Sequence, residues 1–305
     1  MQIMTAPSLE ESYLFCQKLA QGHYENFPVA SVLLPKRLRR PISVIYAFAR
    51  TADDFADEGD APQEFRLEQL NTYSTALQGI KEKSYHETNP IFIALADVIK
   101  QHNLPIQLFD DLLDAFKQDV VKDRYHDFTE VLDYCRRSAD PVGRLLLLLS
   151  NKPTQEQLSQ SDAICSALQL INFYQDIVQD MTESDRIYIP TSELSEFNVK
   201  TNQLTQVDED TTPLAPLMRL QYQRTQKLMS QGYQLGTGLS GRIGWEIRAM
   251  TLGGISTLNL LMLQKDNALL KRPRLSKFKL FKIMLISMSK HLYSYQAKQL
   301  LQTKT

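Results

Sequence analysis

The sequence is poor in glycine and cysteine, and several common functional motifs are missing from it. It has 11 glycines and 3 cysteines in 305 residues, and no CxxC pair joins the cysteines. Neither a disulfide framework nor a zinc site is therefore indicated, and a reducing cytoplasm is the expected location. The absence of GxGxxG, GxxxxGKS/T, HExxH and GxSxG motifs argues against dinucleotide binding, P-loop chemistry, zinc proteolysis and serine hydrolysis.

Long apolar runs and a strong net charge are missing as well. No uninterrupted apolar segment is long enough for a transmembrane helix. The first thirty residues contain three glutamates and lack the apolar core of a secretory signal. A net charge of -1 gives the chain no overall attraction to nucleic acid, so no nucleic-acid partner is expected. Function should therefore come from local sites.

Apolar side chains recur at helical spacing along most of the chain, which predicts an all-α fold. Ser8 is expected to cap a first helix that runs to about Gln21, and Pro41 fits the first turn of the next helix. The other prolines lie mostly between periodic segments, as expected for a helical chain. Further helices are predicted near residues 62–80, 89–102, 105–121, 128–150, 154–181, 213–235, 241–266 and 275–301, with an irregular region over 182–212.

The segment YAFARTADDFAD carries the first candidate site. In a helix, Tyr46, Arg50, Asp53 and Asp57 recur at steps of four, three and four residues and share one stripe, while Asp54 points off it. Carboxylates on one face repel each other and need compensation. The compensation is either solvent, as on an ordinary surface helix, or a divalent metal. Magnesium suits the second case, because it binds one or two carboxylates together with waters and phosphates, and Arg50 would hold the phosphate.

The same spacing occurs a second time, in FDDLLDAF. Asp110, Asp111 and Asp114 repeat the DDxxD pattern, and Lys117 follows at a distance suited to an ordinary surface ion pair. We interpret this copy as a structural face, so the spacing alone does not identify a site.

A second candidate site lies in QLINFYQDIVQDMTESDRIYIP. Asn172, Asp176 and Asp180 are four residues apart and are predicted to lie on one helix, among apolar neighbours that place them beside a partly buried groove. Arg186 and Tyr188 follow on a loop that would fold over a bound anion. Buried acids need a partner, which is either a metal shared with the first acidic helix or an ion pair with Arg136, Arg137 or Arg144.

Two acidic helices with arginines nearby suit the ionisation of an allylic or cyclopropylcarbinyl diphosphate. Metal ions and guanidinium groups stabilise the charge that develops on the departing diphosphate. The abundant Leu, Ile, Phe and Met side chains would line an apolar pocket for the carbocation, although the same residues also serve as plain core.

The segment from about residue 270 to 305 differs from the rest of the chain in being basic and apolar. Such a helix either lies on an anionic membrane surface or packs on the core with a solvated basic face. Peripheral contact with the inner membrane is therefore one expectation. Its basic residues, with only Asp266 as a nearby acid, are Lys265, Lys271, Arg272, Arg274, Lys277, Lys279, Lys282 and Lys290.

Three segments together resemble the squalene and phytoene synthase family. YAFARTADDFAD and NFYQDIVQD with RIYIP are similar to its two aspartate-rich motifs, and YCRRSADPVGRLLL is similar to the helix between them. They occur in the family order and extend the likeness roughly from His23 to Thr257. The resemblance implies a single all-helical isoprenoid synthase domain over residues 1–305, with a central cavity and a dependence on Mg²⁺.

The resemblance also implies roles for individual residues. Arg50, Arg186 and Tyr188 correspond to diphosphate contacts, and Tyr46 joins the catalytic set because it shares a stripe with Arg50. Asn172 and Gln175, in the second motif, are expected to bind substrate. The metal ligands implied by motif position are Asp53, Asp57, Asp176 and Asp180.

The sequence departs from the family pattern at a few positions. Asn26 and Phe27 stand where the family has serine and phenylalanine near the first diphosphate, and Gln175 replaces an arginine. These departures resemble the hopanoid-associated hydroxysqualene synthases, in which ENFPVAS, LLPKRLR and ARTADDFADEG recur. That branch implies conversion of presqualene diphosphate and water to hydroxysqualene and diphosphate, with Mg²⁺ and without NADPH. Asp140, helped by Ser138 and Gln175, is expected to place the water.

Two alternatives remain open at this stage. A complete squalene or phytoene type of synthase would condense two molecules such as farnesyl diphosphate head to head. A membrane-peripheral scaffold in a terpenoid complex would keep the fold without catalysis. A scaffold has no need of intact acids in both motifs, which favours the enzymes.

Overall fold

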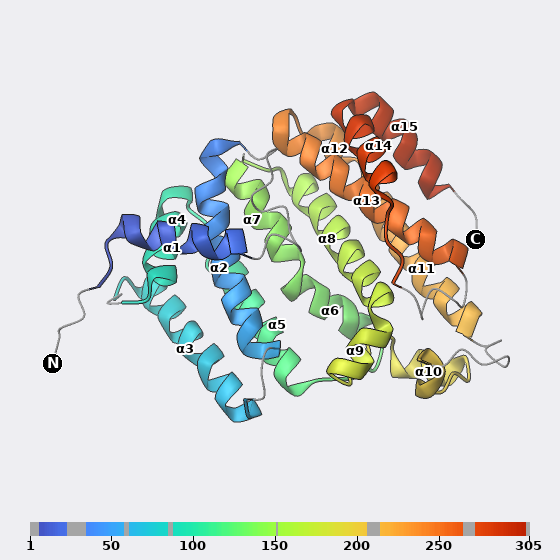
Figure 1. Ribbon diagram of the computed structural model, residues 1–305, viewed down its shortest axis with the longest axis horizontal. Coiled ribbons are helices and arrows are strands. Elements are labelled where there is room, and N and C mark those ends of the chain that lie inside the picture. Colours follow the sequence, from blue (N-terminus) through green and yellow to red (C-terminus); the bar gives the residue numbers. More distant parts are fainter. Residues whose placement is uncertain are drawn as a thin grey trace. The chain divides into compact units, whose positions relative to one another are not determined.

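Helices form the regular secondary structure, as the sequence predicts. The structure, a computed structural model, describes residues 6–22, 35–57, 61–84, 88–150, 152–205, 214–264 and 272–302. Within these ranges there is no strand (Figure 1). An isolated β-bridge joins Arg124 to Ile187. The chain forms two compact units, residues 1–121 with 141–153 and residues 122–140 with 154–305. The expectation of one domain over 1–305 stays a prediction.

The first unit is built around the aromatic ring of Phe48. This residue is fully buried, and its ring centroid lies 5.8 Å from those of Tyr73 and Phe92 and 5.5 Å from that of Phe109. The four rings come from four helices, which the cluster holds together. The helices of this unit are α1 (Leu9–Gly22), α2 (Lys36–Asp57), α3 (Gln63–Glu82), α4 (Pro90–His102), α5 (Gln107–Val121) and α7 (Asp140–Ser150) from its second residue onward.

The second unit is organised around α8. This helix packs against α6, α11, α12 and α13, and Gly232 allows the close approach of α11, because a Cβ there would lie 2.6 Å from the carbonyl oxygen of Gln160. The helical elements of this unit are α6 (Phe128–Ser138), α8 (Gln155–Gln175), α9 (Ile177–Glu183), α10 (Thr191–Glu196), η1 (Thr201–Leu204), α11 (Leu214–Gly232), α12 (Leu235–Gly238), α13 (Gly241–Gln264), α14 (Lys277–Met288) and α15 (Lys290–Leu301).

The N-terminal boundaries of the first two helices differ in how well the sequence predicts them. The predicted cap of α1 is confirmed, because the Glu11 amide donates to Ser8 Oγ at 3.3 Å and the Glu11 carboxylate accepts from the Ser8 amide at 2.7 Å. The predicted start of α2 is wrong. The helix begins at Lys36, so Pro41 lies inside it rather than in its first turn. The preceding run KRLRR consists of good helix formers, which extends the helix over the proline.

Three of the long predicted helices are each divided into two, and one of these breaks, within 154–181, separates α8 from α9. The segment 128–150 breaks at Ala139, because Pro141 has no amide hydrogen to continue α6 but fits the first turn of α7. The segment 275–301 breaks at Ser289, whose backbone is extended and whose Oγ accepts from the Leu292 amide at 3.3 Å to start α15. The irregular region predicted over 182–212 also contains α10 and η1.

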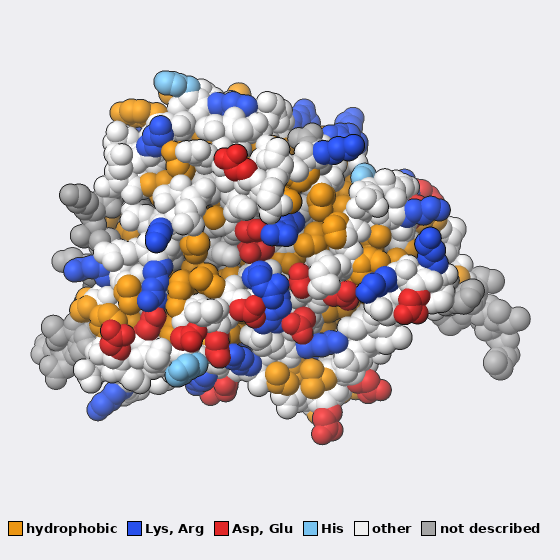
Figure 2. Space-filling model, turned by 180° about the vertical axis from the view of Figure 1, so that it is seen from behind, with side chains coloured by type: hydrophobic (Ala, Val, Ile, Leu, Met, Phe, Trp, Pro, Cys, Tyr) orange, Lys and Arg blue, Asp and Glu red, His pale blue; other side chains and the backbone are white. Residues whose placement is uncertain are grey.

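The surface carries charges of both signs (Figure 2), and the helices are too short or too polar to span a membrane, as the sequence predicts for the described residues. Acidic and basic side chains are interspersed over the face shown in Figure 2, as expected for a net charge of -1. In the described part of the chain, no helix combines the length and the apolar content needed to cross a membrane. The cysteines Cys16, Cys135 and Cys165 are free thiols.

Candidate functional site

The first predicted acidic cluster lies at the C-terminal end of α2. Arg50 Nε is 2.6 Å from Asp54 Oδ1, and Arg50 Nη1 is 3.6 Å from Asp53 Oδ2. Asp57 is exposed and is the last residue of the helix. The C-terminus of a helix carries partial negative charge, so three carboxylates there oppose the helix dipole as well as one another. A bound cation at this end would relieve both repulsions.

Two further side chains shape the end of α2. Arg66 of α3 donates to Ala56 O at 2.5 Å and to Ala61 O at 2.9 Å, which places a second guanidinium against the last turn. Sequence reasoning missed Arg66, because its contacts with backbone carbonyls leave no side-chain pattern. Tyr46 is half-buried, and burial raises the pKa of its hydroxyl while Arg50 opposes the shift. Tyr46 is therefore a neutral hydroxyl near the acidic end.

The DDxxD copy in α5 has a different electrostatic environment. Lys117 donates to Ser74 Oγ at 2.8 Å, and Asp111 accepts from Gln107 at 3.0 Å. Burial raises the pKa of Asp110, while Lys81 opposes the shift. Ser74, Lys117 and the aspartates of this copy line a hollow between α3 and α5. Lys117 therefore binds a neutral hydroxyl in α3, whereas Arg50 in α2 binds a carboxylate of its own cluster.

The second predicted cluster is not on one helix as expected. Asp176 lies between α8, which ends at Gln175, and α9, which begins at Ile177. Its φ of -111° and ψ of 10° are not helical, so the predicted helix breaks at the central acid of the motif. Hydrogen bonds between residues four apart continue across the break. The Asp176 amide donates to Asn172 O at 3.0 Å, and the Asp180 amide donates to Asp176 O at 2.8 Å. Asn172 is exposed, whereas Asp176 and Asp180 are partly buried.

The cation beside Asp176 comes from the segment that precedes α14. Arg272 Nε lies 2.8 Å from Asp176 Oδ1, and Gln175 Nε2 donates to Pro273 O at 2.7 Å. Burial raises the pKa of Asp176, while Arg272 and Arg274 oppose the shift. Arg272, which the sequence alone assigned only to the basic C-terminal segment, is therefore a partner of Asp176. Pairing of the acids of this motif with Arg136, Arg137 or Arg144 stays an alternative prediction.

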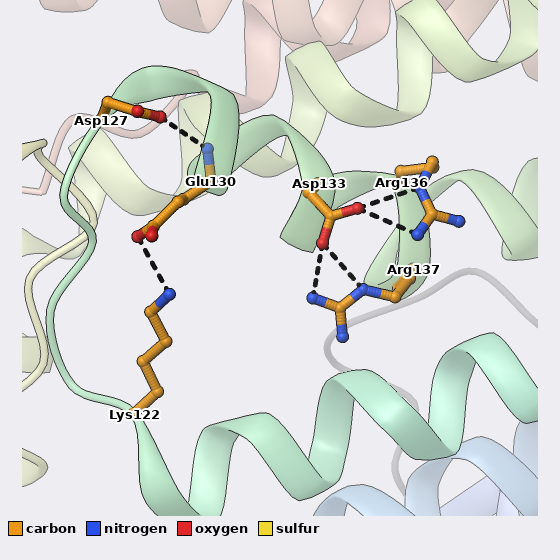
Figure 3. Close-up of polar contacts among 6 residues, drawn as sticks. All are labelled: Lys122, Asp127, Glu130, Asp133, Arg136 and Arg137. Carbon is orange, nitrogen blue, oxygen red and sulfur yellow. Dashed lines mark hydrogen bonds and ion pairs between the residues drawn. The ribbon is translucent and has the colours of Figure 1, made fainter.

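The arginines of α6 are engaged within their own helix. Arg136 Nη2 and Arg137 Nη2 each lie 2.9 Å from a carboxylate oxygen of Asp133 (Figure 3). In the same region the Glu130 amide donates to Asp127 at 3.0 Å, and Lys122 donates to the Glu130 carboxylate at 2.9 Å. These contacts stabilise the start and the middle of α6.

Arg186 and Tyr188 do follow α9 closely, but the tyrosine is buried. The Tyr188 ring stacks on Phe173 of α8, with centroids 3.5 Å apart and planes 7° apart. Arg186 Nη1 donates to the Tyr188 hydroxyl at 3.4 Å, and the Arg186 amide donates to Asp180 O at 3.1 Å. All four side chains line one small cavity. The aromatic stack therefore fixes Arg186 beside Asp180.

Asp140 is a buried carboxylate at the start of α7. It is 7% exposed and accepts from Ser166 Oγ at 2.8 Å. Two residues earlier, Ser138 Oγ is buried and has no hydrogen-bond partner among the described residues. Burial, reinforced by Asp140, raises the pKa of Cys135. A buried hydroxyl without a protein partner is usually satisfied by water.

The donor set of the acidic clusters is compatible with magnesium. Among the described residues, no group of three or more Asp, Glu, His or Cys side chains is arranged to hold a metal alone. Magnesium usually takes one or two carboxylates and completes its shell with waters and phosphate oxygens. Aspartates one helical turn apart fit an ion that a diphosphate helps to coordinate. Two predicted substrate-binding residues, Asn26 and Phe27, lie outside the described residues.

The all-helical fold and the two aspartate-rich segments define an isoprenoid synthase. A family model described as squalene/phytoene synthase matches residues 20–279, and the chain belongs to this family. A squalene synthase HpnC structure from Alicyclobacillus acidocaldarius superposes with a TM-score of 0.76 at 33% identity and covers 84% of this chain and 95% of that one. The predicted fold class is therefore confirmed.

Individual relatives narrow the comparison. The chain is 36% identical to a hydroxysqualene synthase from Rhodopseudomonas palustris over 224 residues, which cover 73% of this chain and 74% of that one. It is 28% identical to a phytoene synthase from Mycobacterium tuberculosis over 270 residues, covering 88% of this chain and 87% of that one. Both members of the family are thus similar over most of the sequence, and the hydroxysqualene synthase has the higher identity.

Proposed function

We propose that the protein is a hydroxysqualene synthase that converts presqualene diphosphate and water to hydroxysqualene and diphosphate, in the service of squalene and hopanoid synthesis. The observation that carries this proposal is the 36% identity to a hydroxysqualene synthase over 224 residues. A water-capture step is also supported by the buried Asp140 carboxylate, which accepts from Ser166 Oγ, and by the buried Ser138 hydroxyl two residues before it.

The reaction begins with loss of the diphosphate. The carbon–oxygen bond breaks heterolytically, and its electron pair leaves with the diphosphate. Magnesium, when bound, supplies positive charge that stabilises the departing group. Arg50 and Arg186 would bind the diphosphate oxygens, as guanidinium groups commonly do. The residues that would hold the ion are Asp53, Asp57, Asp176 and Asp180.

The reaction ends with capture of a carbocation by water. The cyclopropane ring opens by rearrangement, the water oxygen bonds to the cationic carbon, and a proton is released. No electrons are gained in this sequence, so NADPH is not required. Asp140 would orient the water through a hydrogen bond, with the Ser138 hydroxyl as a second contact. A carboxylate that already accepts from Ser166 is held in one orientation, which favours a defined water position.

The competing proposal is head-to-head condensation of two prenyl diphosphates, supported by the similarity to a phytoene synthase. The two are separated by giving the purified protein either presqualene diphosphate or farnesyl diphosphate with Mg²⁺ and no reductant. We expect hydroxysqualene from the first substrate and no product from the second. Formation of presqualene diphosphate from farnesyl diphosphate alone would establish condensation instead.

A variant tests the water site separately. Asp140→Asn keeps the size of the side chain and the hydrogen bond to Ser166 but loses the carboxylate charge. We expect release of diphosphate to continue while hydroxysqualene falls in favour of elimination products, because the cation loses protons when water is misplaced. The control is Ser161→Ala, at a buried serine of α8 that lies five residues before Ser166 in the sequence. An unchanged hydroxysqualene yield in Asp140→Asn would remove Asp140 from the mechanism.

A further inference from the structure

Helix α14 has an apolar stripe that faces solvent. The stripe is opposite the buried side of the helix, where Ile283 and Ser287 are 7% and 0% exposed. Its members recur at steps of three, four and three residues and so lie on one face. They are Phe278 (78% exposed), Phe281 (62%), Leu285 (51%) and Met288 (61%). Single exposed apolar residues are ordinary, but a row of four on one short helix marks an interaction surface.

Polar contacts hold α14 in this orientation. The indole of Trp245 in α13 donates to Met284 O at 3.0 Å and to Ser287 Oγ at 2.8 Å. Arg248 of α13 donates to Ser287 O at 2.5 Å. α14 packs beside α13 and α15 in the second unit (Figure 1). Because these bonds fix the inner side, the helix cannot rotate its apolar stripe inward without breaking them.

The charge around the stripe has one sign. Lys277 and Lys282 flank the stripe on either side, and both are exposed. Arg272 and Arg274, just before the helix, are exposed as well. From residue 267 to the end of the given sequence there is no aspartate or glutamate. A surface with large apolar side chains between basic ones is complementary to anionic headgroups above an apolar interior.

We propose that α14 docks on the surface of an anionic lipid bilayer. Phe278, Phe281, Leu285 and Met288 enter the boundary between headgroups and acyl chains, and the lysines bind lipid phosphates. On α15, Leu292 and Tyr295 are 51% and 61% exposed and extend the same kind of surface. A second copy of the chain fits this face poorly, because a symmetric contact would bring the two sets of lysines together. The proposal does not depend on the proposed reaction.

Sedimentation with lipid vesicles tests the proposal on the full-length protein. We expect binding to vesicles of phosphatidylcholine mixed with phosphatidylglycerol, weak binding to phosphatidylcholine alone, and loss of binding as salt is raised. Equal binding to both vesicle types, no binding to either, or a salt-independent interaction would overturn it. So would a dimer in solution that buries α14, since the face would then belong to a second copy.

Matched variants locate the contact. Phe278→Ser with Phe281→Ser should lower vesicle binding about tenfold or more, because the apolar insertion is lost. Replacing Lys277, Lys279 and Lys282 by glutamine should reduce binding to the level seen with neutral vesicles. Phe65→Ser, at a phenylalanine of α3 that is 51% exposed, should leave binding unchanged. Equal binding by the wild type and the double-serine variant would rule out α14 as the docking surface.

The single tryptophan reports whether a variant keeps its fold. Trp245 is the only tryptophan in the chain, and its indole bonds directly to α14. Its fluorescence should be the same in the wild type and the variants, because the altered side chains point to solvent. The dependence of wild-type binding on lipid charge and salt tests the proposal without any substitution.

Discussion

The end of α2 and the junction between α8 and α9 both combine aspartates with an arginine, but the arginine reaches each cluster differently. In α2, Arg50 is one helical turn from Asp54 and 2.6 Å from its carboxylate. At the junction, Arg272 comes from a distant part of the sequence and lies 2.8 Å from Asp176. The first pair forms whenever the helix forms, whereas the second needs the folded unit. The charge at the junction therefore depends on tertiary structure.

Asp53→Asn should have the largest effect. If the α2 cluster binds the metal–diphosphate, this change removes a negative ligand while keeping the side-chain volume. Loss of a group that stabilises developing charge lowers kcat by about a hundred- to a thousandfold. The measurement is the rate of diphosphate release at saturating Mg²⁺.

The α5 copy provides the matched control for this prediction. Asp114→Asn alters the last acid of an identical DDxxD spacing, and we expect turnover within about twofold of wild type because surface substitutions have small effects. An equal loss in Asp53→Asn and Asp114→Asn would show that the two clusters cannot be distinguished by their neighbouring cations.

Arg272→Ala should have the next largest effect. The guanidinium lies 2.8 Å from Asp176, and the neighbouring Gln175 donates to Pro273 O, one residue after Arg272. If Arg272 also binds diphosphate once the metal occupies Asp176, its loss should lower kcat/KM about tenfold, in line with a charged hydrogen bond. Arg272→Lys should restore part of the loss.

The alternative role of Arg272 predicts a different result. If the guanidinium only tethers the segment before α14, Arg272→Ala should leave kcat/KM unchanged and lower the free energy of unfolding. Urea unfolding of the same variant, followed by the fluorescence of Trp245, measures that quantity. The two roles are thus separated by two measurements on one protein.

Asp54→Asn should have a smaller effect on turnover than Asp53→Asn. Asp54 is off the stripe of Asp53 and Asp57, and its carboxylate lies against Arg50. Its loss would leave the proposed metal ligands in place and free Arg50 to move, so we expect a decrease of a few fold, as for a partly exposed ion pair. An equal loss in Asp53→Asn and Asp54→Asn would show that the helical phase of the site is wrong.

Features set by neighbouring residues could be predicted from the sequence. The Ser8–Glu11 cap of α1, the all-helical fold and the stripe of α2 follow from short-range spacing. The break at Pro141 also has a local cause, but the apolar run LLLLL after it suggested one long helix. The start of α2 was misplaced because the stability of KRLRR as helix outweighs the cost of an internal proline.

Features that depend on distant contacts could not be predicted. Nothing in the residues around Asp176 identifies Arg272 as its partner, and nothing around Ser287 identifies Trp245 and Arg248. Likewise, the stacking of Tyr188 on Phe173 requires the chain after α9 to turn back onto α8. The sequence identified the residues that could take part in chemistry. Which residues contact them is determined by tertiary packing.

The smallest expected effect is a dependence of stability on pH that arises from Asp110, in the DDxxD copy of α5. Burial raises the pKa of Asp110, so the folded protein holds this proton more tightly than the unfolded chain. The free energy of unfolding should therefore fall as pH rises from the ordinary carboxyl range through the raised value. Asp110→Asn removes this titration, and the variant should gain stability relative to wild type over that window.

For Asp133 the expected dependence of stability on pH is opposite to that for Asp110. Burial alone would raise its pKa, but hydrogen bonds from Arg136 and Arg137 hold the pKa below its ordinary value. The ionised Asp133 carboxylate therefore stabilises the folded state above the ordinary carboxyl range, and this stabilisation is lost as pH falls through the lowered pKa. Asp133→Asn should therefore be less stable than wild type at neutral pH, by no more than about 1 kcal/mol because the pair is solvated. The deficit should disappear in acid, and urea unfolding across pH compares both variants. If the free energy of unfolding, relative to wild type, changed with pH in the same direction in Asp110→Asn and Asp133→Asn, the two carboxylates would not differ in their partners.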